Sequence, residues 1–136
     1  MVRIRRTEDL QAVHELDRIT FPGDKPTLEK EATHEWWLAE DAGGPVGFLG
    51  LHLGSSSASI TRVGVVGSAR GNGLQKRLMR TAIQFARRRG IARVCTYVMA
   101  TNIPSLRSLL AVGFKPYRTT TKNGAYFIEL ETQAAS

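Results

Sequence analysis

The stretch SARGNGLQKRLM, residues 68–79, combines glycines and basic side chains in a way that suits the binding of an anion. It follows an apolar run that is typical of a strand, and it opens a segment with the apolar periodicity of a helix. A strand-to-helix loop presents unpaired backbone N–H groups at the positive end of the helix dipole, and glycines let phosphate groups approach them. The junction therefore predicts a phosphate-binding loop, although an ordinary tight turn would also use glycine.

Two other phosphate-binding motifs do not fit this junction. No Gly-Lys-Ser/Thr follows it, so it is not a Walker P-loop, and its glycines do not have the G-x-G-x-x-G spacing of a dinucleotide fingerprint. The formal charge of +7, with a pI near 10.2, indicates an anionic partner. Charge alone does not choose between a nucleic acid, an acidic protein and a polyphosphate cofactor.

The elements that position the junction can be predicted from periodicity and turn residues. Three strands in succession indicate an antiparallel meander, and a strand-helix-strand-helix tract follows it. The predicted strands are residues 2–5, 36–40, 46–53, 59–66 and 92–99, with a terminal hairpin of 115–121 and 125–130 joined by KNG.

Helices are predicted from capping residues and amphipathic stripes. Thr7 is placed to cap a helix with Leu10, Val13, Leu16 and Ile19 on one face, and Thr27 to cap a short one. A basic amphipathic helix from Leu74 stops at Gly90, and a last helix runs from Asn102 to Gly113. The predicted elements thus place a strand before the glycine junction and a helix after it.

Length and cysteine content bound the class of protein. The 136 residues suit one domain, residues 1–136, with a single core. Cys95 is the one cysteine, so no disulfide framework forms within the chain, and a reducing, cytoplasmic setting is expected. No cluster of His and Cys has the spacing of a metal site, and neither a signal peptide nor a run long enough to span a membrane is evident. A soluble protein without metal is expected.

Two motifs in the right order resemble those of the GNAT superfamily of acyl-CoA-dependent N-acyltransferases. VGVVGSARGNGLQKRLM is similar to the coenzyme A motif, whose core is [RQ]-x-x-G-x-[GA], and NIPSLRSLLAVGF is similar to a later motif of Asn, helix, Gly and Phe. RTEDLQAVHELD and the Phe-Pro loop at 21–22 look like the start of the ribosomal-protein N-terminal acetyltransferases. The resemblance implies an α/β fold with a mixed, largely antiparallel sheet flanked by helices, and acetyl-CoA as cosubstrate.

The resemblance also implies which residues bind the cosubstrate. The backbone of Val63, Gly64 and Val65 would pair with the pantetheine arm like an added strand. Asn102 and Ser105 match positions that contact the cofactor, and Gln75 stands where the motif has Gly or Ala. The pyrophosphate loop would consist of Arg70, Gly71, Asn72, Gly73, Leu74, Gln75 and Lys76.

The proton-handling positions depart from the family pattern. In the ribosomal-protein N-terminal acetyltransferases that the sequence resembles, a general-acid tyrosine would fall seven residues after Asn102, where this chain has Leu109, and a general-base glutamate five residues before it, where this chain has Tyr97. The backbone N–H at or near Val65 is the oxyanion donor that the family implies. Tyr97 is a catalytic candidate whose ordinary pKa, near 10, suits an acid better than a base, with a role as a wall of the pocket as the alternative. Trp36 and Trp37 are expected on opposite faces of a strand, one in the core and one at the acceptor groove.

The sequence thus favours an acetyl-CoA-dependent N-acetyltransferase whose acceptor is a primary amine, either a protein N-terminus or a small molecule. Two alternatives stay open. One is a GNAT-fold protein that binds coenzyme A without turnover, which the missing acid and base favour, and the other is a basic nucleic-acid-binding module. No aromatic interleaving or nucleic-acid motif supports the latter, so only weak, salt-sensitive binding is expected. A homodimer is also left open.

Overall fold

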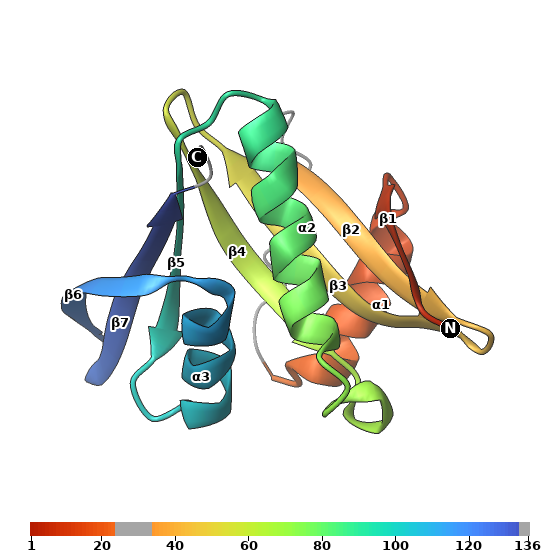
Figure 1. Ribbon diagram of the computed structural model, residues 1–136. Coiled ribbons are helices and arrows are strands. Elements are labelled where there is room, and N and C mark those ends of the chain that lie inside the picture. Colours follow the sequence, from red (N-terminus) through yellow and green to blue (C-terminus); the bar gives the residue numbers. More distant parts are fainter. Residues whose placement is uncertain (24–33, 134–136) are drawn as a thin grey trace.

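The computed structural model describes residues 1–23 and 34–133, which form one sheet flanked by helices (Figure 1). The helix predicted to begin at Thr27 lies outside the described residues. Within these ranges, no helix has the length and apolar character needed to cross a membrane. The elements are β1 (Arg3–Thr7), α1 (Leu10–Thr20), β2 (His34–Asp41), β3 (Gly44–Leu53), β4 (Ser57–Val65), the 3-10 turn η1 (Gly67–Ala69), α2 (Leu74–Arg88), β5 (Arg93–Met99), α3 (Ile103–Val112), β6 (Lys115–Lys122) and β7 (Ala125–Gln133).

The sheet has the strand order β1-β2-β3-β4-β5-β7-β6. Every neighbouring pair is antiparallel except β4 and β5, which are joined through α2 and run parallel. The predicted meander is β2-β3-β4 and the predicted terminal hairpin is β6-β7, so both are confirmed. The mixed, largely antiparallel sheet that the sequence predicted is also confirmed.

Helices α1 and α2 cover opposite faces of the sheet. The apolar stripe of α2, which includes Leu78 and Met79, packs in one core cluster with Trp37, whereas Val13 and Leu16 of α1 pack in a second cluster with Trp36. The two tryptophans therefore face opposite sides of β2, as predicted. The expectation that one of them borders the acceptor groove is wrong, because each is only 4% exposed and fills the core beneath its own helix.

The helix ends follow local capping chemistry, with one correction. Thr7 does not cap α1, because it belongs to β1, where it pairs with Trp36. Asp9 caps α1 instead, and its Oδ1 accepts a hydrogen bond from the Ala12 N–H at 3.2 Å. The predicted end of α2 at Gly90 is confirmed, since that residue has a φ of 75° just beyond the helix.

Candidate active site

The cleft begins where β4 and β5 part. Their parallel pairing covers Ser57, Ala58 and Ser59 of β4 and ends at Cys95 of β5. Immediately beyond it β4 carries a bulge at Thr61, since Gly50 of β3 pairs with Arg62 and the next residue of β3 pairs with Ile60. A bulge increases the local twist of a strand and can turn it away from its neighbour. The separation of the two strands therefore starts at a defined irregularity of β4.

A cavity of about 700 Å³ occupies the space between the separated strands. Residues of β4, β5, α3 and the β6-β7 hairpin line it, together with Phe21 at the end of α1. The lining combines side chains from both faces of the sheet, with Ser105 and Leu109 of α3 on one face and Phe21 at the end of α1 on the other. The lining includes Ile60, Thr61, Arg62, Val63, Thr96, Tyr97, Val98, Met99, Asn102, Ser105, Leu109, Thr120, Lys122, Asn123, Ala125, Phe127 and Glu129.

The backbone of β4 turns hydrogen-bonding groups toward this cavity. The N–H of Val66 bonds to the carbonyl of Val46 on β3, and Gly64 lies opposite Phe48. Because N–H groups alternate along a strand, those of Val63 and Val65 face the other way, toward the side of β5. Val63 lines the cavity, and Val65, at the end of β4, is the second position where an extended ligand could pair.

Gly64, the third predicted pairing residue, has a different place. Its backbone groups face β3, and its missing side chain makes room for a close approach of neighbours. A Cβ there would lie 2.7 Å from Phe48 Cε1 and 2.8 Å from Thr20 Oγ1. The glycine therefore lets α1 pack against β4.

The glycine junction has the geometry of an anion-binding loop. Gly71 and Gly73 have φ values of 86° and 73°, and a Cβ on either would meet no atom within 4 Å, so they are required for conformation and not for space. Gly73 is the N-cap of α2, and it has no side chain that could accept from the first-turn N–H groups of Leu74, Gln75 and Lys76. These three donors stay available for a ligand.

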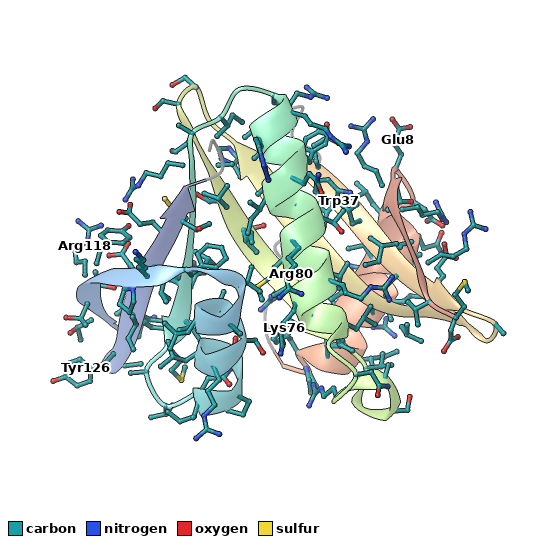
Figure 2. All side chains as sticks on the ribbon, in the orientation of Figure 1. Glu8, Trp37, Lys76, Arg80, Arg118 and Tyr126 are labelled. Atoms are coloured by element: carbon teal, nitrogen blue, oxygen red, sulfur yellow. The ribbon has the colours of Figure 1, made fainter. Side chains whose placement is uncertain are left out.

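Around the junction, one side chain is bonded to β4, whereas two others lie at the tip of the loop and in the first turn of α2. Arg70 turns back, and its Nε donates to the carbonyl of Val65 at 3.0 Å, which holds the loop against the end of β4. Asn72 is exposed at the tip, and Lys76 is half-buried in the first turn of α2, one turn before Arg80 (Figure 2). The loop thus has a rigid base and a basic first turn.

Asn102, Ser105 and Gln75 lie together between α2 and α3. Asn102 caps α3, with its Oδ1 accepting from the Ser105 N–H at 3.3 Å, and Gln75 Nε2 donates to Ser105 Oγ at 3.5 Å. Asn102 and Ser105 also line the cavity. The Gln75 side chain, which replaces the small residue of the motif, therefore lies against α3 and leaves the mouth of the loop open.

Tyr97 projects from β5 into the cavity. Its side chain is 60% exposed, and its ring packs edge-on against Phe127 of β7 with 5.8 Å between the ring centres. Leu109 on α3 lines the cavity from the other side and is only 3% exposed. The structure thus brings the two departures from the family pattern to one cavity, with a hydroxyl on one side and an alkyl group on the other.

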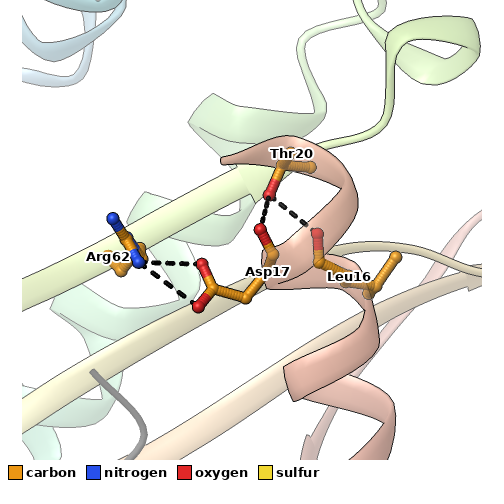
Figure 3. A network of polar contacts seen from close by, with 4 residues as sticks. All are labelled: Leu16, Asp17, Thr20 and Arg62. Atoms are coloured by element: carbon orange, nitrogen blue, oxygen red, sulfur yellow. Dashed lines mark hydrogen bonds and ion pairs between the residues drawn. The ribbon is translucent and has the colours of Figure 1, made fainter. Parts of the chain in front are cut away.

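An ion pair at the side of the cavity near α1 was not predicted from the sequence. Asp17 of α1 and Arg62 of β4 have side chains that are 4% and 15% exposed, and Arg62 Nη1 donates to Asp17 Oδ1 at 2.9 Å and to Oδ2 at 3.2 Å (Figure 3). The guanidinium also lies 4.4 Å from the centre of the Phe21 ring. A charged residue within the otherwise uncharged run SITRVGVV was the signal that could have revealed this pair.

A second missed pair borders the cavity on the hairpin. Arg118 of β6 donates to both carboxylate oxygens of Glu129 on β7, and this contact holds the pKa of Glu129 below its ordinary value. Glu129 lines the cavity, whereas Arg118 lies at the outer edge of the hairpin (Figure 2). The alternation of AYFIEL places Glu129 on the same face as Phe127, but only the pairing with β5 shows which residue it meets.

Comparisons with known proteins agree with this architecture. The Acetyltransferase (GNAT) family matches residues 7–114 of the chain. N-acetyltransferase 8F1 of Mus musculus is 31% identical over 101 residues, which are 70% of this chain and 43% of the relative. The chain thus spans less than half of the length of this curated relative.

Solved structures of low sequence identity share the fold. The ribosomal-protein-S18-alanine N-acetyltransferase of Escherichia coli superposes with a TM-score of 0.86 at 19% identity, over 100% of this chain and 96% of that one. NAA60 of Arabidopsis thaliana in complex with acetyl-CoA superposes with a TM-score of 0.82 at 18% identity, over 98% of both chains.

Proposed function

Because the chain belongs to the GNAT family of acetyltransferases, we propose that it transfers an acetyl group from acetyl-CoA to a primary amine. One observation carries this proposal. The unpaired N–H groups at the start of α2 lie at the end of the same strand, β4, whose separation from β5 opens the cavity that Tyr97 enters. A pyrophosphate site and a reaction site are therefore joined by a single extended strand.

The pyrophosphate of acetyl-CoA would be held at the glycine loop. Gly71, Asn72 and Gly73 supply its backbone, the first-turn N–H groups of Leu74, Gln75 and Lys76 face the phosphates, and Arg70 holds the loop to the end of β4 through the Val65 carbonyl. The pantetheine amides would pair with β4 at Val63 and Val65, while Gly64 shapes the strand. Asn102 and Ser105 would border the same arm from α3. The full set is Val63, Gly64, Val65, Arg70, Gly71, Asn72, Gly73, Leu74, Gln75, Lys76, Asn102 and Ser105.

The chemistry needs a neutral amine, a stabilised oxyanion and a protonated leaving group. The ammonium form of the acceptor first loses one proton to water. The nitrogen then forms a bond to the thioester carbon, and the carbon–sulfur bond breaks. The nitrogen loses its second proton to water, the sulfur gains a proton from a donor in the site, and that donor is reprotonated from water. The N–H of Val65 would stabilise the carbonyl oxygen, and the hydroxyl of Tyr97 would supply the proton that the sulfur takes.

The acceptor would be a protein N-terminus or a small amine. Similarity to a structure named as a ribosomal-protein-S18-alanine N-acetyltransferase, whose name gives a protein as its acceptor, supports the first. The openness of Tyr97 to solvent accommodates either. A cytoplasmic setting accords with a sequence that contains one cysteine.

Calorimetry with acetyl-CoA tests the cosubstrate site by comparing substitutions of two glycines, one at each end of α2. Gly73 and Gly90 have φ values of 73° and 75°, and a Cβ added to either would meet no atom within 4 Å, so Asp at either position meets the same backbone strain. Gly73→Asp puts a negative charge among the phosphates and should weaken binding by at least about 10-fold, or about 1.4 kcal/mol. Gly90→Asp, at the other end of α2, should leave the affinity unchanged. Equal affinities for the two variants, or no binding by the wild type, would remove the assignment.

A further inference from the structure

The place of Glu129 relative to Tyr97 suggests how an acceptor is recognised. Tyr97 of β5 and Glu129 of β7 are direct partners in the antiparallel register. Such partners project from the same face of a sheet with their Cβ atoms about 4.5–5.5 Å apart. Both side chains line the cavity. Glu129 therefore places a carboxylate next to Tyr97 on the adjacent strand.

Glu129 is held as an oriented anion. Arg118 Nε lies 2.5 Å from Glu129 Oε2, and Arg118 Nη2 lies 3.1 Å from Oε1. The guanidinium, which comes from the edge strand β6, therefore donates to both carboxylate oxygens. The Arg118 side chain is 62% exposed and that of Glu129 is 22% exposed. The hydrogen bond from Arg118 is the main cause of the low pKa of Glu129, which keeps it ionised at neutral pH. Each carboxylate oxygen has a second lone pair, which leaves capacity for a donor in the cavity.

Glu129 differs from the other charged residues of the cavity lining in the sign of its charge. Among the lining residues that the structure describes, it is the one that carries a carboxylate. The two cations of that lining are Arg62, whose charge is balanced by Asp17, and Lys122. Among the described lining residues, an acceptor that arrives as an ammonium ion thus has one carboxylate to contact, and this carboxylate belongs to the cross-strand partner of Tyr97.

We propose that Glu129, oriented by Arg118, binds the ammonium group of the acceptor and is the residue that selects amines at this site. The inference rests on the proposed acetyl transfer and identifies the residue that recognises the acceptor of that reaction. Glu129 acts as a binding group and not as the base, because a carboxylate with a lowered pKa is a poor proton acceptor from an amine. The bound ammonium then loses its proton to water next to the thioester.

Glu131 provides a matched control two residues further along the same strand. It faces the same side of β7 and is paired with Arg93, as Glu129 is with Arg118, but it does not line the cavity. Glu129→Gln and Glu131→Gln each remove one carboxylate from a partly exposed ion pair. The cost in stability should be small and similar for the two variants.

The test measures amine binding directly, in the presence of coenzyme A, with spermidine and with a tetrapeptide that has a free N-terminus. Glu129→Gln should weaken binding of both probes by about 10-fold, as expected for one charge-assisted hydrogen bond. It should not change binding of coenzyme A or of the same tetrapeptide with an acetylated N-terminus. Glu131→Gln should match the wild type throughout.

Several outcomes would overturn the inference: equal losses in the two variants, an equal loss for the acetylated peptide, or no amine binding by the wild type. Turnover of acetyl-CoA with the same probes is measured in parallel. A wild type that binds amines through Glu129 but never transfers acetyl would contradict the proposed function and leave the binding site intact. Equal acetyl transfer by the wild type and by Glu129→Gln would contradict only the inference.

Discussion

The hydroxyl of Thr96 on β5 donates a hydrogen bond to the carbonyl of Ile60 on β4, with 3.2 Å between the oxygens. This contact lies just past Ser59 and Cys95, the last parallel pair of the two strands. Thr96 is 9% exposed, so the hydrogen bond is sheltered from water. A side chain thus satisfies a backbone group at the point where the strands separate, and it closes the base of the cavity.

Thr96→Val should therefore destabilise the fold. Valine has nearly the shape of threonine, but it leaves the Ile60 carbonyl without this partner, which costs about 1–3 kcal/mol. We expect a corresponding loss in the free energy of unfolding, measured by urea denaturation with unchanged m-value. Thr96→Ser keeps the hydroxyl and serves as the control, with only the loss of a methyl group, about 1 kcal/mol. A valine variant as stable as the wild type would show that water replaces the hydroxyl.

A second stability prediction concerns the buried pair of Asp17 and Arg62. Asp17→Asn removes the carboxylate to which the largely buried Arg62 guanidinium donates, so it should lower the free energy of unfolding by roughly 3 kcal/mol. The double variant Asp17→Leu with Arg62→Met replaces both charges by apolar groups and should recover much of this loss. Glu40→Gln breaks the exposed pair with Arg5 and should change stability by less than about 1 kcal/mol. Equal effects of Asp17→Asn and Glu40→Gln would show that burial does not strengthen the first pair.

Local signals predicted most of the fold, including the glycine loop before α2. The α2 stripe, Gly73 at its start and Gly90 after its end were readable, because helix periodicity and the left-handed conformation of glycine are properties of neighbouring residues. Asn102 was readable for the same reason, since a cap bonds within its own first turn. Thr7 was misjudged because its place in β1 is decided by pairing with Trp36 of β2, far along the chain.

The rest of the site depends on pairings between distant residues. The bulge at Thr61 arises from the register between β3 and β4, and the contact of Arg62 with Asp17 joins residues 45 apart. The place of Glu129 opposite Tyr97 follows from the strand order, in which β7 lies between β5 and β6. No local pattern specifies a strand order, so these relationships were outside the reach of periodicity and capping rules.

The last prediction concerns the hydroxyl of Tyr97, whose proposed task is to protonate the leaving thiolate. Tyr97→Phe retains the ring and its edge-on contact with Phe127, so the wall of the cavity is preserved. If the hydroxyl takes part in proton transfer, kcat should fall by roughly 10²-fold, while the affinity for acetyl-CoA stays nearly unchanged. Steady-state turnover against peptide N-termini and polyamines, together with calorimetry, gives both quantities.

Tyr126→Phe is the matched control for this substitution, because Tyr126 is 68% exposed and does not line the cavity. It should leave kcat at the value of the wild type. A thiol has an ordinary pKa of about 8.5, so coenzyme A can also leave as the thiolate at modest cost, with the proton supplied by water. In that case Tyr97→Phe and Tyr126→Phe would give the same kcat, and Tyr97 would be a wall of the cavity. A loss confined to Tyr97→Phe identifies its hydroxyl as the proton donor, since the ring and its packing are common to both forms.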